Sequence, residues 1–338
     1  MIYPWQQMQW QQVNQLITAD RLPHALFLQG NEGLGKNDFA IALAHALLCK
    51  QPLADHQACG SCASCKLLAA DSHPDLHYLQ PVPAKKTQSL KPALRIRIGD
   101  IRELCDKLNQ TSQYNGYRIA ILNQADQLTI EAANSLLKTL EEPGREVLII
   151  LTSARAHRLP ITIRSRCQTI RFSVPEEKMS AQWLSERIAA TADTSANEKQ
   201  TGQQISQLLK QAFGSPLAAF DLIAQADQQQ VLADAMTAAI SGKSSLEYAA
   251  KLAKFAKLSM LEQMLCWVSD LNKLMSCGDE TGIINEQYRK KLMLMAKKVN
   301  QKRLFQFYDQ VNLNILHSSI AVNEQLMWEN LLLSWDNL

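Results

Sequence analysis

The pattern of apolar and polar positions divides the chain into two parts. As far as Ser173, short apolar runs typical of buried strands alternate with stretches in which apolar residues recur every three or four positions, as in helices. The strand-like runs are 25–28, 73–79, 118–122 and 147–151, and the helical stretches are 3–22, 39–48, 96–109 and 129–142. Because helices alternate with strands, we predict a parallel α/β sheet in this part.

From Ser173 onward the pattern is helical almost throughout. All 11 prolines lie at or before Pro216, and the residues that follow contain only Gly242, Gly278 and Gly282. Proline and glycine are the residues that most disfavour the interior of a helix, so their scarcity permits long helices. We predict helices at 246–258, 261–275, 287–299 and 303–333, the last of them broken once.

A glycine-rich loop follows the first predicted strand and precedes a helix. Its sequence, Gly30-Asn-Glu-Gly-Leu-Gly-Lys36-Asn37, has Gly30, Gly33, Gly35 and Lys36 at the spacing of a phosphate-binding P-loop. Glycines let successive backbone N–H groups turn toward a phosphate at a helix N-terminus, where the helix dipole favours an anion. We therefore predict a nucleotide-binding loop.

The residues that would carry out ATP hydrolysis are missing. Asn37 follows the lysine, where a serine or threonine hydroxyl is needed to bind magnesium. Asn123 and Gln124 follow the strand at 118–122, where acidic residues are needed to hold the metal and polarise water. An amide is uncharged and takes no proton from water, so we predict an NTPase fold without hydrolysis. The sequence leaves open whether ATP binds.

Four cysteines lie directly after the P-loop helix, at Cys49, Cys59, Cys62 and Cys65. Two overlapping Cys-x-x-Cys steps with a glycine permit the tight turn that directs thiolates at one ion, and four sulfurs complete the tetrahedral coordination of a structural Zn²⁺. His56 is the alternative ligand. Since Cys49 ends a helix, as expected where a module is attached to a preceding element, Cys49 is favoured over His56.

Length and composition limit the possible classes of protein. At 338 residues the chain is long for one domain, and we expect two or three. A net charge of +3 does not indicate strong binding to nucleic acid or membranes by overall electrostatics. The lysines at 85–91 have no interleaved aromatic residues, as base stacking would need. Without a signal-peptide pattern or an apolar stretch of spanning length, we expect a cytoplasmic protein with reduced thiols.

Together these motifs resemble the AAA+ clamp-loader family of bacterial DNA replication. The resemblance rests on the P-loop at 30–37, the four-cysteine insertion at 49–65, Asn134-Ser-Leu-Leu-Lys-Thr-Leu-Glu-Glu-Pro143 and Leu159-Pro-Ile-Thr-Ile-Arg-Ser-Arg-Cys167. Hydrolysing members have Ser or Thr after the P-loop lysine, an acidic pair after the second strand, and an arginine after Gly-Ser in the lid. This chain instead has Asn37, Asn123-Gln124 and Gly214-Ser-Pro, which implies a member that does not turn over ATP.

The resemblance also implies an architecture. It consists of a Rossmann-like AAA+ P-loop domain at 1–170 with a zinc module at 49–65, a helical lid at 171–229, and an all-helical collar or oligomerisation domain at 230–338. The fold class is therefore α/β plus all-α.

The function that the resemblance implies is that of a noncatalytic subunit of the DNA polymerase III clamp loader. The holoenzyme is a DNA-directed DNA polymerase, a nucleotidyltransferase. The chain would join gamma/tau-type ATPase subunits and a delta-type subunit in a heteropentamer that places the sliding clamp on primed DNA, with no membrane partner. Ser165 and Arg166 would serve a neighbour's ATP site, Arg166 as an arginine finger. Two alternatives remain: an active AAA+ ATPase that uses Lys36, and a zinc-dependent DNA-binding module.

Overall fold

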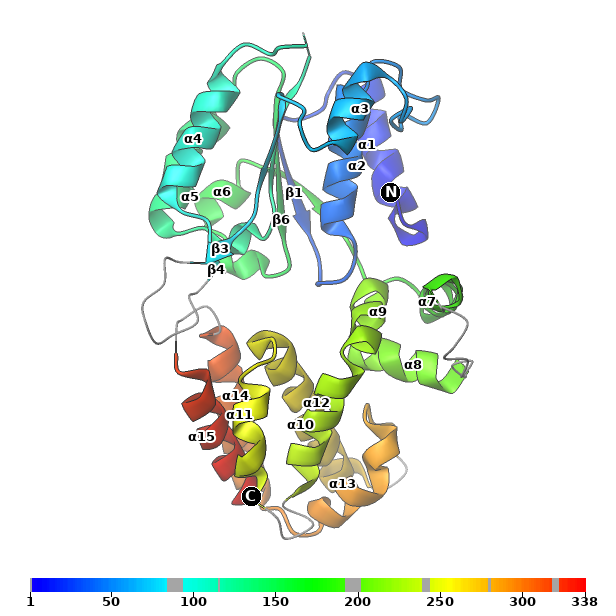
Figure 1. Cartoon of the computed structure of the whole chain (residues 1–338), viewed down its shortest axis with the longest axis vertical. Coiled ribbons are helices and arrows are strands. Elements are labelled where there is room, and N and C mark those ends of the chain that lie inside the picture. Colours follow the sequence, from blue (N-terminus) through cyan, green and yellow to red (C-terminus); the bar gives the residue numbers. More distant parts are fainter. Residues whose placement is uncertain are drawn as a thin grey trace. The chain divides into compact units, whose positions relative to one another are not determined.

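The computed structural model divides the chain into two compact units, one up to Met179 and one from Ser180 onward (Figure 1). It describes residues 2–83, 94–114, 116–191, 202–238, 244–278, 281–317 and 322–338. The three lysines of the predicted loop at 85–91 lie outside these residues. Among the described residues, no helix has both the length and the apolar character needed to cross a bilayer.

A five-stranded sheet in the order β2-β5-β6-β1-β7 forms the centre of the first unit. Its strands are β1 (Ala25–Gln29), β2 (Leu76–Leu79), β5 (Arg118–Leu122), β6 (Val147–Ser153) and β7 (Gln168–Arg171). All of its pairings are parallel, which confirms the predicted sheet. The edge strand β7 was missed, because only Ile170 of its four residues is buried and no apolar run marks it. A separate antiparallel pair joins β3 (Val82–Pro83) to β4 (Leu94–Arg95).

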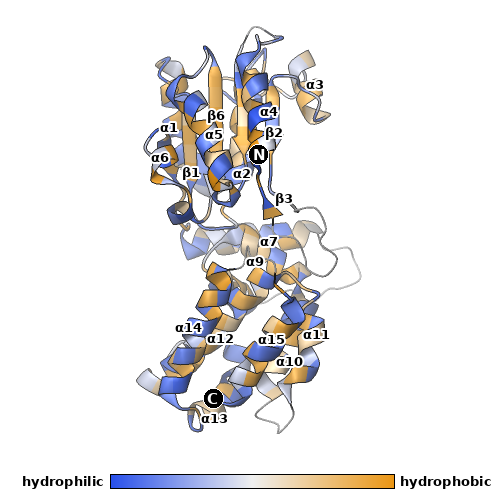
Figure 2. Ribbon diagram, turned by 90° about the vertical axis from the view of Figure 1, so that its left-hand side faces the viewer, coloured by the Kyte–Doolittle hydropathy of each residue, from blue (hydrophilic) through white to orange (hydrophobic). Residues whose placement is uncertain are grey.

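Helices cover both faces of the sheet (Figure 1). One face carries α1 (Gln7–Thr18) and α2 (Lys36–Leu48), and the other carries α4 (Ile98–Asn109) and α5 (Ile130–Glu141). Strand β1 supplies both cores, because its successive side chains point to opposite faces. Phe27 packs with the α4 and α5 side, and Leu28 with the α1 and α2 side. Figure 2 accordingly shows the strands as mostly hydrophobic. The shorter helices are η1 (Pro4–Gln6), α3 (Ala63–Ala69), η2 (Ala125–Gln127), η3 (Ala156–Arg158) and α6 (Ile161–Arg164).

Among its described residues the second unit contains helices joined by loops and no strand, as predicted. Its buried apolar side chains form two clusters, a small one that includes Leu184 and Leu209 and a large one that includes Trp328 and Trp335. The division into a lid and a collar at residue 229 stays a prediction, with which these separate clusters agree. The helices from the unit boundary onward are α7 (Glu177–Thr191), α8 (Gly202–Gln211), α9 (Pro216–Ala224), α10 (Ala226–Ala238), η5 (Ser245–Tyr248), α11 (Ala249–Leu252), α12 (Lys257–Cys277), η6 (Glu286–Tyr288), α13 (Arg289–Ala296), α14 (Gln301–Leu316) and α15 (Glu324–Asp336).

One predicted helix of the second unit is wrong in extent. The segment 246–258 is interrupted after Leu252, and α12 begins only at Lys257. The turn contains no proline or glycine. It lies between Leu252 and Met260, whose side chains are fully buried in one core, and Phe255 packs against the same core. The predicted helix at 303–333 is broken once, as expected.

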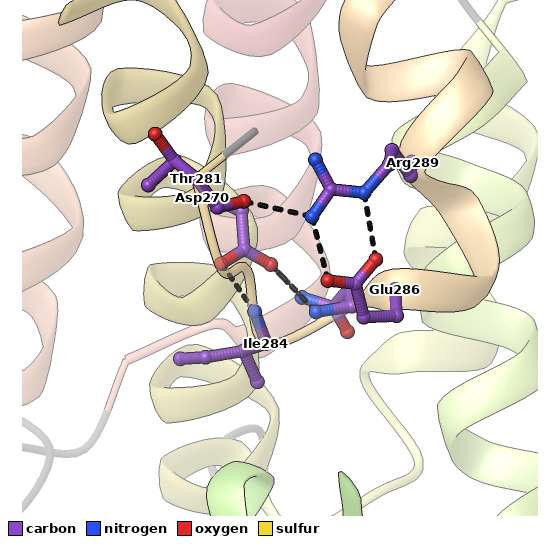
Figure 3. A network of polar contacts seen from close by, with 6 residues as sticks. Asp270, Thr281, Ile284, Glu286 and Arg289 are labelled. Carbon is purple, nitrogen blue, oxygen red and sulfur yellow. Dashed lines mark hydrogen bonds and ion pairs between the residues drawn. The ribbon is translucent and has the colours of Figure 1, made fainter. Parts of the chain in front are cut away.

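A buried carboxylate of α12 binds the segment that precedes η6 and α13 (Figure 3). One oxygen of Asp270 accepts the N–H of Ile284 at 2.7 Å, and the other accepts the N–H and the side-chain amide of Asn285, each at 2.8 Å. Beside it, Arg289 donates to Glu286 and to the carbonyl of Thr281. Because charge-assisted hydrogen bonds compensate for the burial of Asp270, this carboxylate can hold Ile284 and Asn285 against α12.

Candidate functional site

The glycine loop lies between β1 and α2, where the sequence predicts it. Gly33 and Gly35 have left-handed backbones, with φ of 72° and 75°. A Cβ on Gly30 would lie 2.3 Å from the carbonyl oxygen of Phe172, which leads out of β7. These three glycines are therefore required by backbone conformation or by close packing.

The N-terminal segment holds this loop from one side. The side chain of Gln6 is fully buried, and its Nε2 donates to the carbonyls of Leu34 and Gly35 at 2.9 and 2.8 Å. The indole N–H of Trp5 donates to the same Leu34 carbonyl at 3.1 Å. Sequence reasoning missed these contacts, because Gln6 is one of several glutamines in a helical pattern.

Lys36 is buried, with 8% of its surface exposed. Its ammonium donates to the carbonyl of Asn31 at 2.6 Å. Burial lowers the pKa of Lys36 to about 8, although the charges of Glu32 and Asp126 oppose this shift. A desolvated ammonium beside a helix N-terminus is suited to attracting an anion.

The structure brings the two predicted amide positions to the same end of the sheet. The hydroxyl of Tyr78, on β2, donates to Oδ1 of Asn37 at 3.0 Å. The hydroxyl of Thr152, on β6, donates to Oδ1 of Asn123 at 2.8 Å and accepts the N–H of Gln124 at 3.2 Å. Burial raises the pKa of Tyr78, while hydrogen bonds with Asn37 and Asn123 oppose the rise. Nothing in the sequence pattern singles out Tyr78 or Thr152.

The four predicted cysteines form one cluster. Their sulfur atoms all lie within 4.8 Å of one another, and Cys49 lies 3.9 Å from Cys62 and 3.6 Å from Cys65. Sulfurs bound tetrahedrally at about 2.3 Å from zinc lie about 3.8 Å apart. The cluster is therefore compatible with a metal ion held by four thiolates.

Backbone geometry prepares this cluster for negative charge. The N–H of Cys59 points to Cys49, that of Cys62 to Cys59, and that of Cys65 to Cys62, at 3.3 to 3.4 Å. Backbone hydrogen bonds from Ser61 and Cys62 lower the pKa of Cys59 to about 6, whereas burial raises that of Cys65 to about 12. A bound cation favours the thiolate form of every ligand, including the buried one.

His56, the alternative ligand, lies outside the cluster. Its Nε2 is 3.2 Å from the hydroxyl of Thr18 at the end of α1. Two other side chains of α1 donate to the carbonyl of Asp55. They are the indole N–H of Trp10, at 3.2 Å, and the side-chain amide of Asn14, at 3.0 Å. The loop before the cysteine knuckle is thus docked on the first helix.

Arg166 and Ser165 lie on the loop after α6. One guanidinium nitrogen of Arg166 forms an ion pair with Glu141 at 2.5 Å, and the other donates to the carbonyl of Thr162 at 2.8 Å. The hydroxyl of Ser165 donates to the same Thr162 carbonyl at 3.2 Å. In this chain alone, Arg166 is therefore paired with an acid of its own surface.

A GxxxxGK loop between the first strand of a parallel sheet and its helix defines a P-loop α/β protein. Comparison with known proteins narrows this class. The family model described as "DNA polymerase III, delta subunit" matches residues 5–176, and that described as "DNA polymerase III, delta subunit, C terminal" matches 203–337. The chain belongs to this DNA polymerase III delta family.

Two relatives, both named as delta' subunits, narrow the assignment to the delta' subunit. DNA polymerase III subunit delta' of Pseudomonas aeruginosa is 30% identical over 100% of this chain and 98% of its own length. The subunit of the same name from Escherichia coli is 34% identical over 68% of this chain and 62% of its own length. A solved DNA polymerase III gamma subunit-related protein from Thermotoga maritima aligns with 97% of this chain and 99% of its own, at 16% identity and a TM-score of 0.46.

Proposed function

We propose that this chain is a noncatalytic subunit of the DNA polymerase III clamp loader, which helps to open the sliding clamp and place it on primed DNA. Its membership of the delta' family supports the assembly. The observation that carries the loss of catalysis is the pair of neutral side chains, Asn37 and Asn123, at the positions that hold magnesium in hydrolysing P-loop proteins. Neither amide supplies the charge or the base that hydrolysis needs.

Its partners in this proposal are gamma/tau-type ATPase subunits and a delta-type subunit. The helical region at 230–338 would join them in a collar. The exposed apolar side chains of α14 and α15, among them Phe305, Leu316 and Leu326, are available for such contacts. The complex, rather than this chain alone, would meet the clamp and DNA in the cytoplasm.

The metal at the cysteine cluster in this proposal is a structural Zn²⁺, bound by Cys49, Cys59, Cys62 and Cys65. Four thiolates without an open position suit a structural rather than a catalytic ion. The ion would fold a segment that has few buried apolar side chains of its own.

Arg166 in this proposal acts on the ATP of a neighbouring subunit. Its ion pair with Glu141 lies at the surface, with side-chain exposures of 35% and 50%, and exposed pairs contribute about 0–1 kcal/mol. Phosphate oxygens of a neighbour's nucleotide can therefore replace Glu141 at small cost. An always-charged planar guanidinium suits the charge that develops in phosphoryl transfer.

One experiment tests both parts of the proposal. The complex is reconstituted with wild-type chain, Lys36→Ala, Arg166→Ala or Arg164→Ala, and ATP turnover is measured with clamp and primed DNA. We expect Lys36→Ala to leave turnover unchanged, because this chain hydrolyses nothing. We expect Arg166→Ala to lower it clearly, since essential arginine fingers contribute about 10³ to 10⁵ in rate at their site. Arg164→Ala, the matched control, should have much less effect.

Two results would contradict the proposal. Turnover by the purified chain alone that disappears in Lys36→Ala would make it an active AAA+ ATPase. Unchanged turnover in an intact Arg166→Ala complex would remove the arginine finger and leave the chain as a passive spacer.

A further inference from the structure

A cavity of about 210 Å³ lies in the second unit, where α8, α10, α12 and η6 meet. The buried part of its lining includes Ala233, Cys266 and Trp267, and the exposed part includes Ala226 and Gln287. Sites for drug-sized ligands have volumes of about 300–1,000 Å³, so this smaller cavity suits a group about the size of one ring.

Carboxamides provide most of the polar surface of this cavity. Among the described residues that line it, none carries a charged side chain. Burial also raises the pKa of Cys266 to about 12, so its thiol is neutral. An ion would lose its hydration here without gaining a partner, so the cavity favours an uncharged ligand. The carboxamides belong to five glutamines and one asparagine, namely Gln211, Gln229, Gln230, Gln263, Gln287 and Asn285.

One of these carboxamides has an unused hydrogen-bond donor. Gln230 accepts the hydroxyl of Tyr288 at 3.3 Å, and Nε2 of Gln229 donates to the carbonyl of Leu222 at 3.0 Å. By contrast, Nε2 of Gln263 is buried and has no hydrogen-bond partner within the described part of the chain. Because a buried donor without a partner costs free energy, a ligand oxygen that accepts from Gln263 would be stabilised.

An aromatic pair forms another part of the lining. The ring centroids of Trp267 and Tyr288 are 4.8 Å apart, and their planes are inclined by 36°. Aromatic surface next to carboxamides suits a flat, unsaturated ring whose edge carries a hydrogen-bond donor beside an acceptor. Nucleobases have such edges, and the side chains of glutamine and asparagine pair with them through one donor and one acceptor.

We propose that this cavity is a binding site for a nucleobase. The base enters from the side of Ala226 and Gln287, and one of its oxygens accepts from Gln263. It belongs either to a free nucleoside or to an unpaired nucleotide of single-stranded DNA, because the cavity contacts only the base. The inference goes beyond the proposed function, which does not require this cavity.

A ligand-observed NMR titration of the full-length protein with thymidine tests the proposal. Thymidine carries no phosphate, so the glycine loop contributes nothing to its binding. We expect a dissociation constant of about 1 mM or lower, as suits a ligand of this size. The affinity should not change with salt, because neither the ligand nor the lining is charged.

Two variants connect this binding to the cavity. Gln263→Leu removes the unpaired donor and should weaken thymidine binding by about tenfold. Ala226→Phe adds a ring at an exposed position of the lining and should weaken it by about tenfold or more, because the ring obstructs the cavity. The control is Gln306→Leu, at an exposed glutamine of α14, which should bind as wild type does. Circular dichroism checks that each variant is folded.

A single-stranded oligothymidylate distinguishes the two sources of the base. If it binds more tightly than thymidine, and Gln263→Leu weakens that binding, the base comes from single-stranded DNA. If it binds no more tightly, the ligand is a free nucleoside.

Three results would overturn the inference. They are absence of thymidine binding, equal affinity in wild type and Gln263→Leu, and tighter binding of the peptide analogue N-acetylalaninamide than of thymidine. The last would assign the cavity to a peptide amide instead. None of them affects the proposed function, which is tested by ATP turnover.

Discussion

The two ends of helix α2 differ in whether the side chains that a metal ion needs are present. At the N-terminus, the glycine loop and Lys36 remain, but the metal positions hold Asn37 and Asn123. At the C-terminus, Cys49 joins three more cysteines in a cluster with a full set of four sulfur ligands. Helix α2 therefore begins at a glycine loop with amides at the metal positions and ends at four cysteines close enough to bind one metal ion.

The two sites differ in how far apart their residues lie in the sequence. All four cysteines lie in one short stretch, and losing any one of them removes a ligand from a segment with little core of its own. The nucleotide site draws on residues from β2, β5 and β6 that are far apart in sequence. The strands that carry them are held by buried residues such as Ile119 and Leu148, so the side chains at the ends of these strands can vary without disturbing the sheet.

The largest expected effect tests the metal-binding end of α2. Cys62→Ser should lower bound metal from about one ion per chain to nearly none, measured by elemental analysis, because a serine hydroxyl supplies no thiolate at neutral pH. Cys62 is also the N-cap of α3, where its sulfur accepts the N–H of Cys65 at 3.4 Å. Serine is itself a favoured N-cap, so the substitution keeps this role and removes mainly the ligand.

The control is Cys277→Ser, at the exposed end of α12, which should keep its metal and its melting temperature. Cys62→Ser should melt at a lower temperature and should respond less to a chelator than the wild-type protein does. A metal content equal to that of wild type would show that Cys62 is not a ligand.

Local features of the fold were predictable from the sequence. The strand at 25–28, the loop at 30–37 and the cysteine spacing each depend on residues that are neighbours in the chain. The same holds for the predicted helix at 129–142, because the hydroxyl of its first residue, Thr129, accepts the N–H of Ala132 at the start of α5. Such features are governed by backbone chemistry that acts over three or four residues.

Contacts between distant segments were not predictable. Tyr78 meets Asn37 only because β2 lies beside β5 at the edge of the sheet, and an isolated tyrosine in a short strand carries no such signal. The ion pair of Arg166 with Glu141 likewise depends on the packing of α5 against the loop after α6. In the second unit, the turn after Leu252 is set by core packing rather than by a helix-breaking residue.

The next effect, of intermediate size, tests the nucleotide end of α2 through pH. Lys36 has a pKa of about 8 in the free protein, because burial disfavours its charged form.

The stability of the folded chain should depend on pH through the pKa of Lys36. The pKa of Lys36 is 10.5 in the unfolded chain and about 8 in the folded one. Between these values the unfolded state binds more protons, so this residue makes the free energy of unfolding rise with pH. Lys36→Met should remove that rise in urea denaturation measured across this range. An unchanged pH dependence in Lys36→Met would show that Lys36 titrates normally.

The smallest effect concerns one glycine of the cysteine knuckle. Gly60 has φ of +74°, and a Cβ placed on it would meet no atom within 4 Å. Gly60→Ala therefore creates no clash, and its cost is the left-handed backbone alone, about 1 kcal/mol. Metal affinity should fall by about fivefold, measured by competition with a chelator.

Gly99→Ala is the matched control, since Gly99 also has open space around it but lies in the first turn of α4. There alanine should raise the free energy of unfolding by about 0.5 kcal/mol and leave metal affinity unchanged. A Gly60→Ala chain that binds metal as tightly as wild type would show that the cysteine turn does not need this backbone conformation.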